Sequence, residues 1–193
     1  MISWTEQEPD FELQPVEALF ARLGFASAVA VWSRIGTGLQ IVIQESVRSS
    51  IEAHLLSQHV EQGGLLIGSA FGSASDDQLI VTIEDSVAAD EATGTGVSLV
   101  MGSKVWENAR GRCTGKRTVV GWYHSHPNLG AFFSGTDRST QRGFFSNAHS
   151  VGLVSDPIRR EEKWFSGPES VEVPATSRML LIASTHPECA GRA

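Results

Sequence analysis

The segment from His124 to Asp137, HSHPNLGAFFSGTD, is the most informative part of the 193-residue sequence. It follows RTVVGWY (117–123), a β-branched and aromatic run that predicts a strand. Residues two apart in a strand point to the same face of the sheet. The side chains of His124 and His126 can therefore converge on one ion, which makes this strand end a candidate metal site.

Ser134 and Asp137 stand near the start of a helix that we expect over residues 137–145. A carboxylate at that position can reach back to the two imidazoles and complete a site with three protein ligands. Three ligands leave the fourth tetrahedral position for water, which is typical of a catalytic zinc ion, and the donor set favours zinc over other divalent ions. Ser134-x-x-Asp137 also fits a capping box at the helix start, and the two interpretations are compatible.

Amide hydrolysis at such a site needs more than the metal. Zinc lets water ionise near neutral pH, a carboxylate that does not bind the metal must move the proton, and a donor must hold the oxyanion. Ser134 can be that donor. For Glu61 the residues alone leave two interpretations open, the catalytic base or a solvated carboxylate at a helix end.

The pattern His-x-His, seven residues, Ser, two residues, Asp resembles the JAMM motif of the MPN-plus, or JAB-domain, metallopeptidases. Its four positions are filled in this chain by His124, His126, Ser134 and Asp137. The upstream glutamate of that family is matched by Glu61 in HVEQGGLLIG (59–68), and SVGLVSDP (150–157) resembles the family's strand followed by Asp-Pro. The similarity extends from about residue 45 to residue 185.

This resemblance implies an α+β fold of three-layer α/β/α type, in which helices flank a mixed sheet. It implies one catalytic Zn²⁺ held by His124, His126 and Asp137. Glu61 would be the acid–base and Ser134 would support the tetrahedral intermediate. The implied activity is that of a zinc isopeptidase or peptidase at the C-terminus of a ubiquitin-like protein, in deconjugation or precursor processing.

The compact chain looks similar to stand-alone prokaryotic, deubiquitinase-like members of the family. Some of these serve bacterial conjugation systems, including antiviral ones, so cognate conjugation enzymes are expected partners. Two alternatives stay open. The same chemistry could trim a sulfur-carrier protein or a short peptide, or the chain could be a non-catalytic scaffold, against which the complete set of motif residues argues.

Composition disfavours several other classes of protein. The net charge of −7 opposes binding to nucleic acid. We see no apolar run of the roughly 20 residues that a membrane helix needs and no secretory signal at the acidic start. Cys113 and Cys189 form neither a CxxC pair nor a disulfide framework, and they also exclude the zinc deaminases that His59-x-Glu61 would otherwise suggest. A cytoplasmic protein is the expectation.

We expect three parts along the chain: an arm and strands over residues 1–44, the metallopeptidase domain over 45–185 and a tail over 186–193. Residues 87–96 and 156–176 read as variable loops. Further elements follow from periodicity. The expected helices are 15–23, 46–60 and 102–110, and the expected strands are 26–32, 39–44, 65–71, 78–84, 150–154 and 178–183, with the first two joined as a hairpin at Gly36 and Gly38.

Two aromatic positions near the motif have defined expectations. Trp122 is expected in the core. Phe132 and Phe133 lie between the metal ligands, where they could pack beneath the site or line a groove for an extended substrate tail.

Overall fold

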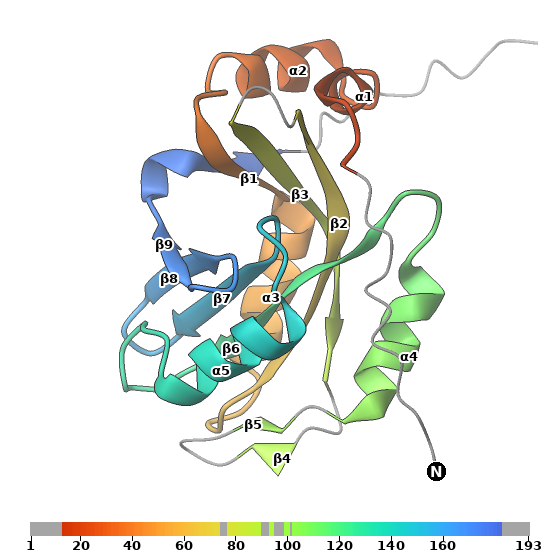
Figure 1. Ribbon diagram of the computed structural model, residues 1–193. Coiled ribbons are helices and arrows are strands. Elements are labelled where there is room, and N and C mark those ends of the chain that lie inside the picture. Colours follow the sequence, from red (N-terminus) through yellow and green to blue (C-terminus); the bar gives the residue numbers. More distant parts are fainter. Residues whose placement is uncertain (1–12, 74–76, 90–92, 95–98, 101, 183–193) are drawn as a thin grey trace, which may run out of the picture.

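A computed structural model describes residues 13–73, 77–89, 93–94, 99–100 and 102–182 (Figure 1). The helices are α1 (Val16–Phe20), α2 (Phe25–Trp32), α3 (Glu45–Leu55), α4 (Ser103–Arg112) and α5 (Gly135–Phe144), with a short 3-10 helix η1 (Ala175–Ser177). The strands are β1 (Gly38–Gln44), β2 (Gly63–Ser73), β3 (Gln78–Ala88), β4 (Thr93–Gly94), β5 (Leu99–Val100), β6 (Thr118–Ser125), β7 (Val151–Asp156), β8 (Glu161–Ser166), β9 (Val171–Val173) and β10 (Arg178–Leu181).

Eight of the strands form one mixed sheet in the order β10-β1-β3-β2-β6-β7-β8-β9, while β4 and β5 pair separately. β6 lies between β2, to which it is antiparallel, and β7, to which it is parallel. The sheet curls, and helices pack on it from different sides (Figure 1). The expected α+β fold with a mixed sheet and flanking helices is confirmed.

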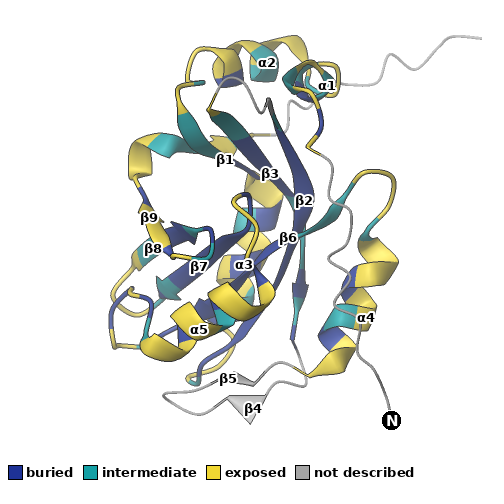
Figure 2. Ribbon diagram, in the orientation of Figure 1, coloured by how far each residue is buried: buried dark blue, intermediate teal, exposed yellow. Residues whose placement is uncertain are grey.

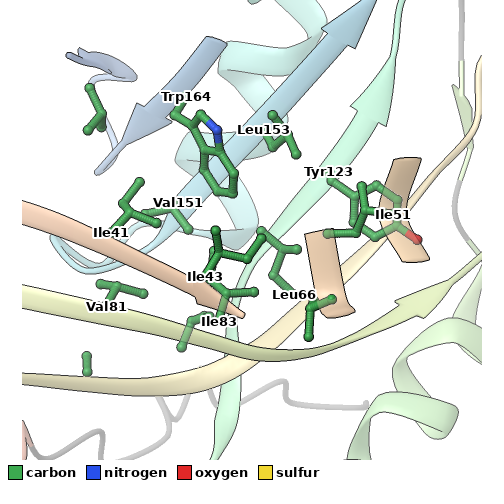
Figure 3. Close-up of a cluster of buried hydrophobic side chains, with 14 of the residues drawn as sticks. Ile41, Ile43, Ile51, Leu66, Val81, Ile83, Tyr123, Val151, Leu153 and Trp164 are labelled. Carbon is green, nitrogen blue, oxygen red and sulfur yellow. The ribbon is translucent and has the colours of Figure 1, made fainter. Parts of the chain in front are cut away.

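The face of the sheet covered by α3 is an apolar core. α3 presents Val47, Ile51 and Leu55, spaced by four residues, to this core, as an amphipathic helix does. Figure 3 shows side chains from β1, β3, β7 and β8 meeting there around Trp164. α3 ends at Leu55, five residues earlier than expected. The chain turns there because the Gln62 side chain accepts the backbone N–H of Gln58 at 3.1 Å.

A second buried cluster combines side chains of α4 with the residues that lead into α5. Val105 and Ala109 of α4 belong to it, together with Trp122 of β6, so the expected core position of Trp122 is confirmed. Figure 2 shows the central strands buried, whereas the outer surfaces of α4 and α5 are exposed. His124 lies against this second cluster, where its ring contacts Trp122 and Phe133.

Residues 26–32 are not a strand, which corrects the expected N-terminal hairpin. They form helix α2, with Gly24 in extended conformation before its first residue. The alternation of Val and Ala in FASAVAVW resembles a strand, but alanine is the strongest helix former and needs no partner strand. α1, expected within residues 15–23, is confirmed, and both helices contribute to a third buried cluster with β1, β2 and β3.

The segment 156–176 is also not a loop, because it contains β8 and β9. β8 pairs antiparallel with β7, and β9 pairs antiparallel with β8. The turn between β7 and β8 is short and places Arg160 at a φ of 57°. The sequence EEKWFS does not predict a strand because its first three residues are charged. The two residues that follow them, Trp164 and Phe165, are buried.

The remaining elements match their expected positions to within a few residues, except that β3 continues through Ala88 into the expected loop 87–96. Residues 90–92, 95–96 and the tail 186–193 lie outside the described residues. β1, which lies in the expected first part of the chain (1–44), pairs with β3 and β10 of the expected second part (45–185). The division of the chain at residue 44 stays a prediction. Within the described residues, none of the helices has the length and apolar character to cross a membrane.

Candidate metal centre

The two histidines lie at the end of β6 and are both buried. His124 pairs in register with Gly63 of β2 and with Val154 of β7. One residue beyond the strand, the His126 backbone N–H still donates to the Ser155 carbonyl oxygen at 2.8 Å. The extended backbone therefore continues past β6, and both imidazoles point to the same side, as the spacing predicts.

Asp137 comes from the first turn of α5, which Ser134 caps. The Ser134 hydroxyl oxygen accepts the Asp137 backbone N–H at 3.2 Å, and Asp137 Oδ2 accepts the Ser134 N–H at 2.6 Å. This capping box leaves Oδ1 facing His124 Nε2 at 3.3 Å. The capping and metal-ligand interpretations of this pair thus apply together, with one carboxylate oxygen for each.

The donor atoms of His124, His126 and Asp137 all lie within 4.8 Å of one another. The Nε2 atoms of the two imidazoles are 3.2 Å apart, and the nearest Asp137 oxygen lies 3.6 Å from His126 Nε2. Bonds of roughly 2.0–2.1 Å in tetrahedral geometry place zinc ligands about 3.4 Å from one another. The Asp137 oxygen nearest to His126 is Oδ2, whereas the one nearest to His124 is Oδ1. The three side chains therefore lie close enough to one another to bind a single zinc ion.

Glu61 lies beside this group and does not belong to it. Its Oε1 atom is 3.9 Å from His126 Nε2, and the residue is only 5% exposed. The neighbouring Gln62 is tied to Ser125 of β6 by N–H bonds in both directions, at 3.0 and 2.8 Å. The segment before β2 is thus fixed against the strand that carries the histidines, and Glu61 is not a solvated helix-end residue.

The surroundings shift the pKa values of the Glu61 and Asp137 carboxyl groups in opposite directions. Burial, and then the negative charge of Asp137, raise the pKa of Glu61 to about 7. Burial opposes ionisation of Asp137 as well, but the contacts with His124 and Ser134 outweigh it and lower its pKa to about 2. Burial and the neighbouring His124 lower the pKa of His126. Asp137 is thus suited to bind a cation, and Glu61 to exchange a proton near pH 7.

The His124 ring is held by packing. Its Nδ1 atom is buried without a hydrogen-bond partner among the described residues, whereas the Trp122 indole stacks on the ring at 4.5 Å with an angle of 6°. Trp122 Nε1 donates to Gln141 Oε1 of α5 at 2.7 Å. Gly152 makes room for this bond, because a Cβ there would lie 2.5 Å from Phe133 and 3.1 Å from Trp122 Nε1.

Phe132 and Phe133 take one each of the two expected roles. Phe133 is 5% exposed and stacks on Phe165 at 4.0 Å, beneath the site. Phe132 is 47% exposed, and its ring lies 4.9 Å from that of His126. One ring therefore belongs to the core, and the other forms an apolar surface next to the candidate metal ligands.

The structure brings together all five residues that the sequence singled out, and it adds two, Gln141 and Asp156, for which the sequence predicts no role. Gln141 is fully buried and follows Asp137 by four residues, so its position on the inner side of α5 was a usable signal. Asp156 is also fully buried and accepts several backbone N–H groups. Its place directly after a buried strand and before Pro157 was the corresponding signal.

The chain matches one protein family and several curated proteins. The family described as prokaryotic homologs of the JAB domain matches residues 44–164, more than half of the chain. The 26S proteasome non-ATPase regulatory subunit 14 of Drosophila melanogaster is 38% identical over 101 residues, covering 49% of this chain and 32% of that protein. The ubiquitin carboxyl-terminal hydrolase RPN11 of Saccharomyces cerevisiae is 36% identical with the same coverage.

The 26S proteasome regulatory subunit rpn11 of Schizosaccharomyces pombe is 31% identical over 140 residues, covering 66% of this chain and 45% of that protein. The chain thus spans a third to less than a half of the length of these relatives. Among solved structures, protein DSY2949 from Desulfitobacterium hafniense matches 74% of this chain and 92% of its own, with a TM-score of 0.53 and 17% identity. That likeness concerns the fold alone.

Proposed function

The chain belongs to the family of prokaryotic JAB-domain proteins, and on this premise we propose that it is a zinc-dependent isopeptidase or peptidase. Its proposed reaction is hydrolysis of the bond after the C-terminus of a ubiquitin-like protein. The observation that carries the proposal is the convergence of buried His124, His126 and Asp137, with the buried carboxyl of Glu61 beside them. The name of the yeast relative, a ubiquitin carboxyl-terminal hydrolase, supports the substrate class.

His124 and His126 would hold the metal through their Nε2 atoms, and Asp137 through the carboxylate oxygen that the capping box leaves free. A bound zinc ion supplies Lewis acidity and lets water ionise near neutral pH. Asp137 contributes the negative charge that a divalent cation needs, and its low pKa keeps that charge at all relevant pH values.

Glu61 would move the proton. Its carboxyl lies 3.9 Å from His126 Nε2, close to the ligands without completing their group. A group with a pKa near the working pH both accepts and returns a proton readily, and burial brings Glu61 to about 7. Glu61 would accept a proton from the attacking water and return it to the departing amine.

Ser134 would stabilise the oxyanion. One lone pair of its hydroxyl is engaged by the Asp137 N–H, and a hydroxyl retains a proton that it can donate. Since the helix cap fixes the Ser134 backbone, the donor is preorganised, and preorganised donors contribute most to stabilising developing charge.

The half-exposed ring of Phe132, with exposed Leu129 nearby in the chain, offers an apolar contact for an extended C-terminal tail. We further propose a cytoplasmic setting beside cognate conjugation enzymes, with antiviral conjugation systems as one such setting. The resemblance to stand-alone prokaryotic members supports this part of the proposal. A sulfur-carrier protein or a short peptide is the alternative substrate for the same residues.

The test compares the unaltered chain with Glu61→Gln on a fusion that carries a reporter after the C-terminus of a ubiquitin-like protein. Zinc content is measured on the same preparations. We expect Glu61→Gln to retain zinc and to lose at least about 100-fold in turnover. His126→Ala should lose both zinc and turnover. Normal turnover of Glu61→Gln would refute the mechanism, and absence of zinc from the unaltered chain would favour the scaffold alternative.

A panel of substrates separates the remaining possibilities. Cleavage of a sulfur-carrier fusion or a short peptide, with no cleavage of any ubiquitin-like fusion, would reassign the substrate. The zinc site and Glu61 would keep their roles in that case.

A further inference from the structure

The buried carboxylate of Asp156 lies outside the five motif residues, and it collects backbone N–H groups from two turns. Its Oδ1 atom accepts from Asn128, Ile158 and Arg159 at 3.0, 3.0 and 3.1 Å, and its Oδ2 atom accepts from Gly130 at 2.7 Å. The residue is 0% exposed. These four bonds outweigh the effect of burial and hold the pKa of Asp156 below its ordinary value, so the carboxylate is charged.

The turn that Asp156 holds is the one between the metal ligands. Residues 127–131 lead from His126 to Phe132 and onward to the Ser134 cap. Asn128 and Gly130 have positive φ values of 62° and 89°; glycine adopts such values readily, whereas they are uncommon for residues with a side chain such as Asn128. Apart from Asp156, the turn has few anchors, among them the Leu129 N–H bond to the His126 carbonyl oxygen and the Ala131 N–H bond to Glu161 Oε2 at 3.3 Å.

We propose that Asp156 is a positioning residue of the metal centre, which fixes the turn 127–131 and thereby holds His126 and Phe132 in place before the metal binds. The proposal rests on the proposed function, since it assigns His126 to a metal. Among the described residues, Asp156 shows no hydrogen bond to the candidate ligands or to Glu61, and its charge acts on His126 only as a minor influence that raises the His126 pKa. It acts through the backbone, at the point where β7 ends beside β6.

The test measures zinc affinity by competition with a chelator in the unaltered chain and in Asp156→Asn. The asparagine side chain has one acceptor oxygen, and its NH₂ group is a donor. Either the Gly130 N–H or the N–H groups of Asn128, Ile158 and Arg159 would therefore face a donor in place of an acceptor. Outer-shell partners typically contribute 10–100-fold to metal affinity, and we expect a loss of at least about tenfold. Zinc affinity within about twofold of the unaltered chain would overturn the proposal.

A merely structural role for Asp156 would lower stability without changing the affinity of the folded protein. Val81→Ala is the matched control, because Val81 is equally buried but lies in the α3-side core, away from the turn. We expect Val81→Ala to be less stable and to bind zinc normally. An equal loss of zinc affinity in Val81→Ala would show that stability alone sets the affinity, and the proposal would fail.

If Asp156→Asn does not fold, Gly130→Ala tests the same turn. Alanine is strained at a φ of 89°, while its Cβ meets only Glu161 Oε2 and Arg159 at ordinary distances of 3.5 and 3.6 Å. Weaker zinc binding by several-fold would support the proposal, and unchanged binding would overturn it.

Amide hydrogen exchange in the metal-free protein separates this proposal from the proposed function. We expect exchange at Asn128 and Gly130 to accelerate at least about tenfold in Asp156→Asn while exchange in β2 stays slow. If the unaltered chain bound no zinc, the proposed function would fail. Faster exchange would then still support control of the turn by Asp156, and unchanged exchange would refute it.

Discussion

His124 and His126 are separated by one residue, yet their imidazoles are held by different means. The His124 ring stacks on the Trp122 indole, and the indole N–H donates to Gln141 of α5. His126 lies beyond the strand, next to the half-exposed Phe132 and before a turn that depends on a buried carboxylate. One half of the site is held by ring packing, whereas the other is held by hydrogen bonds between a turn and a buried carboxylate, beside a half-exposed ring. We expect substitutions around His124, the packed half, mainly to change the free energy of unfolding. We expect substitutions in the turn after His126, the turn half, mainly to change the affinity for zinc.

The largest expected effect compares the two ligands directly. His124→Ala and His126→Ala should each abolish zinc binding and turnover, because two remaining protein ligands make a poor zinc site. In the metal-free protein, His124→Ala should lose about 1–2 kcal/mol more stability than His126→Ala, since it leaves a space under Trp122. Urea unfolding in the presence of a chelator measures the difference. Equal losses would show that the two halves do not differ in packing.

The adjacent phenylalanines provide the next comparison. Phe133→Ala should destabilise the protein by about 3–5 kcal/mol, as expected for a buried aromatic ring. Phe132→Ala should change stability by less than about 0.5 kcal/mol, and it should raise KM for a ubiquitin-like fusion several-fold with little change in kcat. Thermal unfolding and steady-state kinetics check the pair. A large loss of stability in Phe132→Ala would contradict the assignment of this ring to the surface.

Acid should weaken the packed half through His149, which precedes Ser150, the residue whose carbonyl oxygen accepts from Gln141. Burial lowers the pKa of His149 from 6.5 to about 4. Between these values the folded protein binds fewer protons than the unfolded chain, so stability falls as the pH drops from about 6.5 to 4. The contribution is at most about 3 kcal/mol. Urea unfolding at several pH values should show a smaller slope in His149→Gln, and an identical slope would exclude His149 as the source.

The smallest expected effect concerns the hydrogen bond from the Trp122 indole, which stacks on His124, to Gln141. Gln141→Leu should cost about 1–2 kcal/mol, because the Trp122 N–H would stay buried without an acceptor. Trp122→Phe should cost less stability in the Gln141→Leu background than in the unaltered chain, since there it also removes the unpaired donor. A double-mutant cycle measures the coupling between the two positions. Purely additive effects would mean that the bond does not link Gln141 to the stack.

Some parts of this molecule are easier to predict from sequence than others, for physical reasons. The five residues of the motif lie together in the structure, because a cluster built on a strand end and a helix start leaves a fixed spacing in the chain. No role follows from the sequence for Gln141, or for Asp156 within the Asp-Pro step of SVGLVSDP, because their hydrogen bonds reach mainly backbone groups and a residue 19 positions away. Residues 26–32 read as a strand because alternation of Val and Ala fits both periods. Residues 161–166 read as a loop because the first three of them are charged, although β8 lies inside the sheet between β7 and β9.

The pairing of β10 with β1 has a consequence for synthesis of the chain. Residue 41 lies beside residue 178, which is 137 positions later (178 − 41 = 137). At roughly 5–20 residues per second, a ribosome needs about 7–27 s to travel that distance. During this interval β1 lacks its β10 neighbour, while the strands around the histidines are made one after another and the last of them, β7, ends at Asp156, 22 residues before Arg178 (178 − 156 = 22). The strands that carry the candidate metal ligands can therefore pair before β10 covers the edge of β1, and an uncovered edge strand is a site at which chains associate.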